Sequence, residues 1–284
     1  MNTTMNTVNQ TFDWSRFVST LHKELVENKR ALIITVVSIY VLLTFVMTCG
    51  NAIAYSSNTL LDQLWNYVPQ KTVYTILLIV MAVGASLSFR SLKRKTSRAA
   101  MFSSPSSTLE KFLANVLIYV VGLFVAFLAC AQLADLTRIG ILTLYGHDIQ
   151  VIGTINFMNL IHDTVLGTGT GAANVPGFNW AAWLSLVAVP GLYVLGSIVW
   201  PRLSLLKTFV ASQAITIALS IIVSNLVNLF IPDEQFDNWM ISHLDNGSFA
   251  NGFAIFMAIQ AVLFWGLAWY LFKRKDVVSL KWWK

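Results

Sequence analysis

Two His-Asp steps are the residues whose types could support catalysis or metal binding. They are His147-Asp148 and His162-Asp163. An imidazole beside a carboxylate could ligate a metal ion or form part of a protease-like pair. However, no nucleophile stands at a recognisable elbow, and the sequence has no His-Glu-x-x-His motif. We therefore interpret both steps as polar surface residues and expect neither a metal site nor a catalytic set.

A glycine-rich stretch at residues 167–172, GTGTGA, superficially suggests a phosphate-binding loop. It lacks the Lys-Ser/Thr pair that follows the glycines in a P-loop, and no strand precedes it. We interpret it as a flexible turn.

A line of amides and hydroxyls is more informative. It recurs every three or four residues within an otherwise apolar run, and comprises Ser212, Gln213, Thr216, Ser220, Ser224, Asn225 and Asn228. Polar groups are costly in a bilayer unless they face protein or a wet cavity. This stripe is either part of a substrate path or the contact between helices of a bundle or dimer. No charged residue is expected in mid-membrane, so a pump would need energy from elsewhere.

The composition is that of a polytopic membrane protein. The chain has 284 residues, 56% hydrophobic and only 11% charged, with a mean hydropathy of +0.65, whereas soluble domains carry about a quarter charged residues. Six apolar runs are long enough to cross a hydrocarbon core of about 30 Å. They are residues 31–50, 72–89, 112–134, 180–200, 205–231 and 250–272. We predict an all-α domain of six transmembrane helices over residues 31–284.

The basic residues predict the orientation of these runs. All of the 19 Lys and Arg residues except Lys71 and Arg138 fall on one side of the six runs. By the positive-inside rule, both termini are cytoplasmic. The segment with the most positive charge, residues 90–111, is then a cytoplasmic loop, within which residues 96–102 could form a short helix. Residues 135–179 form the longest outer segment, and residues 151–166 could be an interfacial or re-entrant helix.

The N-terminal region precedes the first run. We expect residues 1–11 to be a disordered tail and residues 12–30 to be an amphipathic helix capped by Asp13 or Thr11. This helix lies either in the membrane interface or against a soluble partner. No signal peptide is visible, so the first spanning helix would act as its own insertion signal. For Cys49 and Cys130, two buried thiols are favoured over a disulfide.

Residues 103–113, SSPSSTLEKFL, resemble the Pro-Ala-Ser-x-x-Glu-Lys-Phe-Leu signature of permease subunits in the type-2 class of ABC exporters, in the form common among Bacteroidetes. Ser106 stands where that family usually has Ala. Residues 196–208, which end in Leu-Lys-Thr, resemble the family's loop before the fifth span. Residues 271–275 resemble its basic C-terminal end, and the N-terminal amphipathic helix is similar to its elbow helix.

The resemblance implies a permease in the bacterial inner membrane, forming a dimer with itself or a paralogous permease. A separate ABC ATPase subunit would bind ATP and Mg and dock on the loop of residues 90–111. We expect this chain neither to catalyse a reaction nor to bind nucleic acid. The residues expected at the ATPase contact are Arg94, Lys95, Arg98, Met101, Phe102, Pro105, Glu110 and Lys111. Pro105 would end the coupling helix, and Ser107 or Thr108 would cap the next one.

A second interpretation needs no ATPase. The chain could be a self-standing membrane protein, such as an immunity factor, a sensor or an assembly scaffold, and its basic loop would then be solvated. The residues do not identify a substrate, because a polar stripe between apolar walls suits lipids, peptides and drugs alike.

Overall fold

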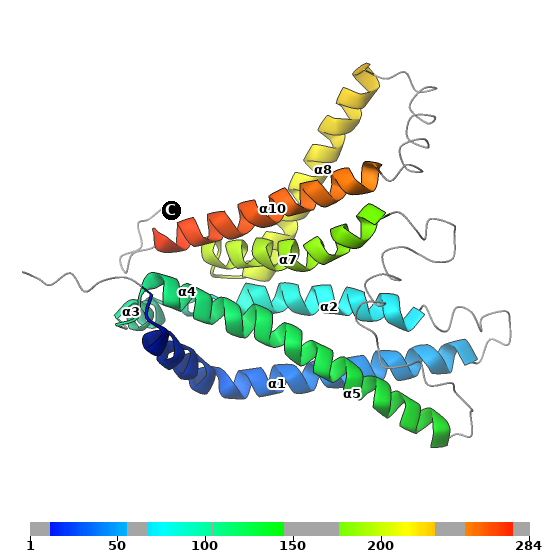
Figure 1. Cartoon of the computed structure of the whole chain (residues 1–284), viewed down its shortest axis with the longest axis horizontal. Helices are drawn as coiled ribbons and strands as arrows, with labels where there is room; N and C mark the ends of the chain where they lie inside the picture. Colours follow the sequence, from blue (N-terminus) through cyan, green and yellow to red (C-terminus); the bar gives the residue numbers. More distant parts are fainter. Residues whose placement is uncertain (1–11, 56–67, 104, 145–175, 231–247, 275–284) are drawn as a thin grey trace, which may run out of the picture.

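A computed structural model of the chain describes residues 12–55, 68–103, 105–144, 176–230 and 248–274. All of its regular elements within these ranges are helices (Figure 1). In chain order they are α1 (Trp14–Tyr55), α2 (Val68–Leu87), η2 (Arg90–Lys93), α3 (Lys95–Ser103), α4 (Thr108–Val116), η3 (Leu117–Gly122), α5 (Leu123–Leu144), α7 (Pro176–Val199), α8 (Ser204–Phe230) and α10 (Ser248–Lys273). The all-α expectation is therefore confirmed for the described residues.

Four helical stretches in the described part of the chain are long and apolar enough to cross a membrane. They are Trp14–Thr48, Thr108–Ile141, Ser204–Ile222 and Asn251–Lys273. Two shorter apolar stretches, Val73–Leu87 and Trp183–Val199, lie within α2 and α7. Each of the six apolar runs expected from the sequence therefore coincides with a helix. Helices of this length and composition are typical of membrane proteins.

Two boundaries differ from the expectation. The amphipathic segment 12–30 and the first run are one unbroken helix, α1, which changes direction along its length (Figure 1). The rod formed by α4, η3 and α5 continues as helix to Leu144, past Asp135, where the outer segment was expected to begin. The expected helix at 151–166, the glycine-rich turn and both His-Asp steps lie outside the described residues.

The helices pack in two pairs with α2 between them. α1 lies along α5, α7 lies along α10, and α2 contacts α7 and α5 (Figure 1). One end of this bundle is closed by an aromatic cluster in which the Phe89 ring lies 5.6 Å from that of Phe112 and 4.9 Å from that of Phe272, measured between ring centroids. Phe89 and Phe272 are fully buried. Such ring pairs contribute about 1 kcal/mol each beyond their buried area, so they fix the ends of α2, α4 and α10.

Glycines allow the closest helix approaches. A Cβ at Gly84 would clash with the Leu123 side chain and the Tyr119 carbonyl oxygen, and one at Gly196 would overlap Thr208 of α8. Small residues serve this purpose in membrane helices, because they let backbones approach. Gly191, beside Pro190 in α7, faces the Trp265 indole, whose Nε1 donates to the Val187 carbonyl oxygen at 3.0 Å. The indole of Trp265 therefore packs directly against the backbone of α7.

Candidate functional site

The segment 90–111, called here the coupling segment, folds as η2, α3 and the first turn of α4. Arg94 separates the first two with an extended backbone (φ −107°, ψ 141°), and α3 then covers the stretch 96–102 where a short helix was expected. The Arg98 guanidinium donates from Nη2 to the Leu92 carbonyl oxygen at 2.8 Å, and the Ser91 hydroxyl donates to the Met101 sulfur at 3.1 Å. These contacts hold α3 against η2.

The side chains of Arg98 and Met101 therefore make contacts inside the chain that hold α3 in place. Met101 is buried, and Arg98 is half-buried against η2. In contrast, Arg94 and Pro105 are exposed. Lys95 and Phe102 belong to α3, but their side chains are outside the described part of the structure. Of the residues expected at an ATPase contact, Arg94 and Pro105 are thus the described ones whose side chains are accessible.

The first turn of α4 is a complete capping box. The Ser107 hydroxyl accepts a hydrogen bond from the Glu110 backbone N–H at 3.2 Å, and the Glu110 carboxylate accepts one from the Ser107 backbone N–H at 2.8 Å. Each interaction satisfies a helix-end donor that has no partner in the helix. The expected cap at Ser107 is confirmed, and Glu110 completes it.

Glu110 also binds the start of α1. Its Oε1 accepts a hydrogen bond from the Asp13 backbone N–H at 3.0 Å and lies 3.4 Å from Nη2 of Arg16. Asp13 in turn caps α1, because its Oδ1 accepts a hydrogen bond from the Ser15 backbone N–H at 2.9 Å. The Glu110 side chain is fully buried, and Lys111 is 6% exposed. Both were expected at a partner contact, but their side chains lie inside the chain, because α4 packs beneath the start of α1.

A shallow groove of about 380 Å³ runs between the start of α1 and the coupling segment. Ser15, Ser19 and Lys23 line one side, while Ala100 and Pro105 line the other. Its walls therefore combine the N-terminal part of α1 with the accessible face of α3.

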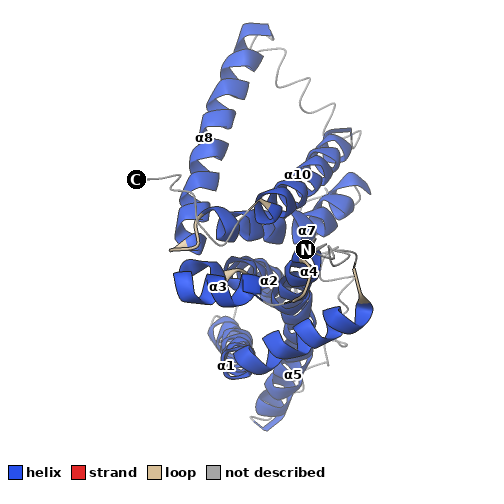
Figure 2. Cartoon of the chain, turned by 90° about the vertical axis from the view of Figure 1, so that its left-hand side faces the viewer, coloured by secondary structure: helices blue, strands red, loops and turns tan. Residues whose placement is uncertain are grey.

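The polar stripe lies along α8, which diverges from the other helices (Figures 1 and 2). Gln213, Thr216, Ser220 and Asn225 are exposed, and the side chains of Ser224 and Asn228 are outside the described part. The Thr216, Ser220 and Asn225 side chains each donate to a carbonyl oxygen of α8 itself at 2.9 Å. Within this chain, the described stripe lines no path between helices.

A buried ion pair in α5 was not predicted from the sequence. Arg138 was placed outside the membrane, but it is 2% exposed, and its Nη2 lies 2.7 Å from Oδ1 of Asp135, which is 5% exposed. The i, i+3 spacing was the available signal, since it places both side chains on one helix face. Cys130, one turn earlier, is a buried free thiol, as expected for that residue. The described residues contain no group of three or more potential metal ligands.

The described residues thus define an all-helical bundle with apolar helices of membrane-spanning length and a capped, internally braced segment at one end. No family model matches the chain, and neither the curated proteins nor the solved structures gave a match.

Proposed function

We propose that the chain is the permease subunit of an ATP-driven exporter, with six spans, both termini in the cytoplasm, and a separate ABC ATPase that docks on the coupling segment. The observation that carries the proposal is α3. It is a nine-residue helix held against η2 by Arg98 and Met101 while Arg94 stays exposed. A rigid helix projecting from a helical bundle is suited to transmit movement of a bound partner.

The bracing of Glu110 extends this mechanism. Because Glu110 binds both the Ser107 and Asp13 backbone amides, displacement of the coupling segment would be passed to the start of α1. Glu110 is then a positioning residue, and Arg94 belongs to the docking surface. ATP and Mg would be bound by the ATPase, in line with the resemblance of residues 103–113 to type-2 exporter permeases.

A dimer is part of the proposal. α8 exposes Gln213 and Thr216 beside large apolar side chains such as Ile217. Amides in lipid are stabilised by partners on another helix, and a second permease would supply them. The stripe would then lie at the subunit contact, where it could also border a substrate path.

The test is reconstitution with the ABC ATPase that we expect to be encoded next to this chain. We expect the ATPase to co-purify and its ATP hydrolysis to be stimulated by the permease. Arg94→Glu should reduce the stimulation at least about tenfold, because a reversed charge at a contact costs several kcal/mol. Lys273→Glu, at the exposed end of α10, is the matched control. A chain that functions without any ATPase would favour the self-standing alternative.

A further inference from the structure

A polar cavity of about 440 Å³ lies between α1 and the coupling segment, and it shares Lys23 and Ala100 with the adjoining groove. Three structural units form it: α1, the end of α2 with η2 and α3, and the α4–η3 rod. Leu87, the last residue of α2, lines one edge and is 37% exposed. Because the apolar stretch Val73–Leu87 ends here, the cavity begins where the hydrocarbon core would give way to headgroups.

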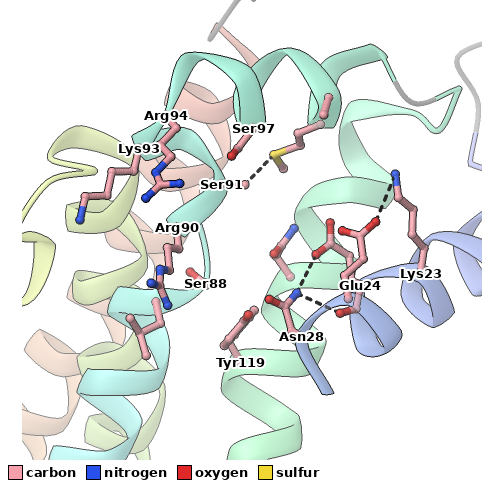
Figure 3. A pocket seen from close by; sticks show the side chains of 15 residues that line it. Lys23, Glu24, Asn28, Ser88, Arg90, Ser91, Lys93, Arg94, Ser97 and Tyr119 are labelled. Atoms are coloured by element: carbon pink, nitrogen blue, oxygen red, sulfur yellow. Dashed lines mark hydrogen bonds and ion pairs between the residues drawn. The ribbon is translucent and has the colours of Figure 1, made fainter. Parts of the chain in front are cut away.

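The charges of the cavity are divided between its two walls. Figure 3 shows Arg90, Lys93 and Arg94 on one wall, and Lys23 and Glu24 of α1 on the opposite wall. In the described part of the chain, the three cations of the first wall form no ion pair.

The wall formed by α1 is acidic at Glu24. Lys23 is paired with Glu27 at 3.9 Å, so these two charges offset each other. The Glu24 carboxylate lies near both of these charges, and Nδ2 of Asn28 donates to its Oε2 at 3.3 Å. A hydrogen bond from a neutral amide leaves the negative charge of the carboxylate in place. A cationic wall thus faces an anionic group across the cavity.

Neutral polar groups line the space between the walls. Ser88 and Asn115 are buried, and Tyr119 lies between Arg90 and Glu24 in Figure 3. The Ser88 hydroxyl and the Asn115 amide donate to the carbonyl oxygens of Ala85 and Lys111, so both side chains are already held in place at the cavity wall. The cavity volume also lies within the range of small-ligand sites.

We propose that this cavity binds a phosphoethanolamine group, with the phosphate on Arg90 and Arg94 and the primary ammonium on Glu24. Guanidinium groups match phosphate oxygens in a bidentate geometry. An ammonium carries three N–H donors, which Glu24 and the oxygens of Asn28 and Tyr119 can accept. The lining carries four cations and two carboxylates, which favours an anionic phosphate, and the position of Glu24 opposite Arg90 and Arg94 favours a ligand that also carries an ammonium.

The same chemistry has two sources: the headgroup of phosphatidylethanolamine or free phosphoethanolamine. The apolar edge at Leu87 favours the lipid, because acyl chains could leave the cavity there. This inference goes beyond the proposed transport function. Because Arg94 also belongs to the proposed docking surface, lipid retention by variants of Glu24 and Arg90, measured without an ATPase, distinguishes the two proposals.

The test uses the full chain in nanodiscs containing equal amounts of phosphatidylethanolamine, phosphatidylcholine and phosphatidylglycerol. Lipids that stay bound after extraction into detergent are quantified by mass spectrometry. We expect phosphatidylethanolamine to be retained in at least about tenfold excess over phosphatidylcholine, whose quaternary ammonium has no N–H to donate to Glu24. Equal retention of all three lipids would exclude the lipid as the source of the group, and a preference for phosphatidylglycerol would overturn the proposal.

Variants separate the two ends of the ligand. Glu24→Gln should abolish the preference for phosphatidylethanolamine over phosphatidylcholine, whereas Arg90→Gln should lower retention of both. Lys273→Gln, a basic residue outside the cavity, should change neither. If free phosphoethanolamine raises the melting temperature of the lipid-depleted wild-type chain but the lipid is not enriched, the site stands and its source is the soluble compound. If neither binds wild-type protein, the proposal is refuted without any variant.

Discussion

The fully buried carboxylate of Glu110 accepts a hydrogen bond at 3.0 Å from the backbone N–H of Asp13, a residue 97 positions earlier in the chain. The same side chain accepts a hydrogen bond from Ser107 in the capping box of α4. One anion therefore joins the first turns of two helices, where it also faces the positive ends of their dipoles. The orientation of the N-terminal part of α1 depends on this residue of the coupling segment.

Replacing Glu110 by Gln should destabilise the chain by about 1–3 kcal/mol, because the buried charge-assisted contacts to Asp13 and Arg16 are weakened. Ser107→Ala removes one hydrogen bond of the cap and should cost about 1 kcal/mol. Thermal unfolding in detergent gives both values. If Glu110→Gln costs no more than Ser107→Ala, the contact with α1 contributes nothing.

Gly196→Ala should destabilise the packing of α7 on α8, because the added methyl group would overlap the Thr208 side chain. The expected cost is about 1–3 kcal/mol, as for other overpacked sites. Gly266→Ala in α10 is the control, since no atom of a neighbouring element lies within 4 Å of the position that its methyl group would take, and it should gain up to about 1 kcal/mol of helix propensity. Melting temperatures measured in the same detergent compare the two, and equal shifts would contradict the close approach.

Asp135→Ala should lower the free energy of unfolding by about 3–5 kcal/mol, because the Arg138 guanidinium would stay buried without its carboxylate. The double variant Asp135→Ala/Arg138→Met should recover most of this loss, since it buries no charge. A double-mutant cycle measures the coupling between the two side chains. Additive effects would indicate that the two residues contribute separately.

Cysteines on the polar stripe should cross-link two copies of the chain if the permease pairs with itself. With Cys49 and Cys130 replaced by Ala, Gln213→Cys or Thr216→Cys is expected to give an oxidised dimer in membranes, because a disulfide requires Cα atoms within about 7 Å. Ile222→Cys, on the opposite face of α8, is the control. Non-reducing electrophoresis reports the product, and cross-linking at Ile222 alone would place the contact on the apolar face.

Local signals in the sequence predicted much of the candidate site. Pro105 was expected to end the coupling helix and Ser107 or Thr108 to cap the next one; α3 ends at Ser103, and Ser107 caps α4. Such motifs act within one turn of backbone, so they can be predicted from the sequence without knowledge of the fold. The solvent exposure of their side chains could not be predicted in this way. The Glu-Lys step at 110–111 has the composition of a partner contact, yet both side chains are covered by the start of α1.

The sequence by itself determined the all-helical class and the positions of the apolar helices, because length, hydropathy and caps are properties of neighbouring residues. Only the tertiary structure decided which charges are used internally. Asp13 and Arg16 meet Glu110, Asp135 and Arg138 share a buried face, and Arg90 faces Glu24 across a cavity (Figure 3). The first and last of these relationships join residues far apart in the chain, and burial of the Asp135–Arg138 pair depends on the helices packed around α5. Helix packing determines both the contacts between distant residues and the burial of this pair. The spacing of residues along the sequence does not encode that packing.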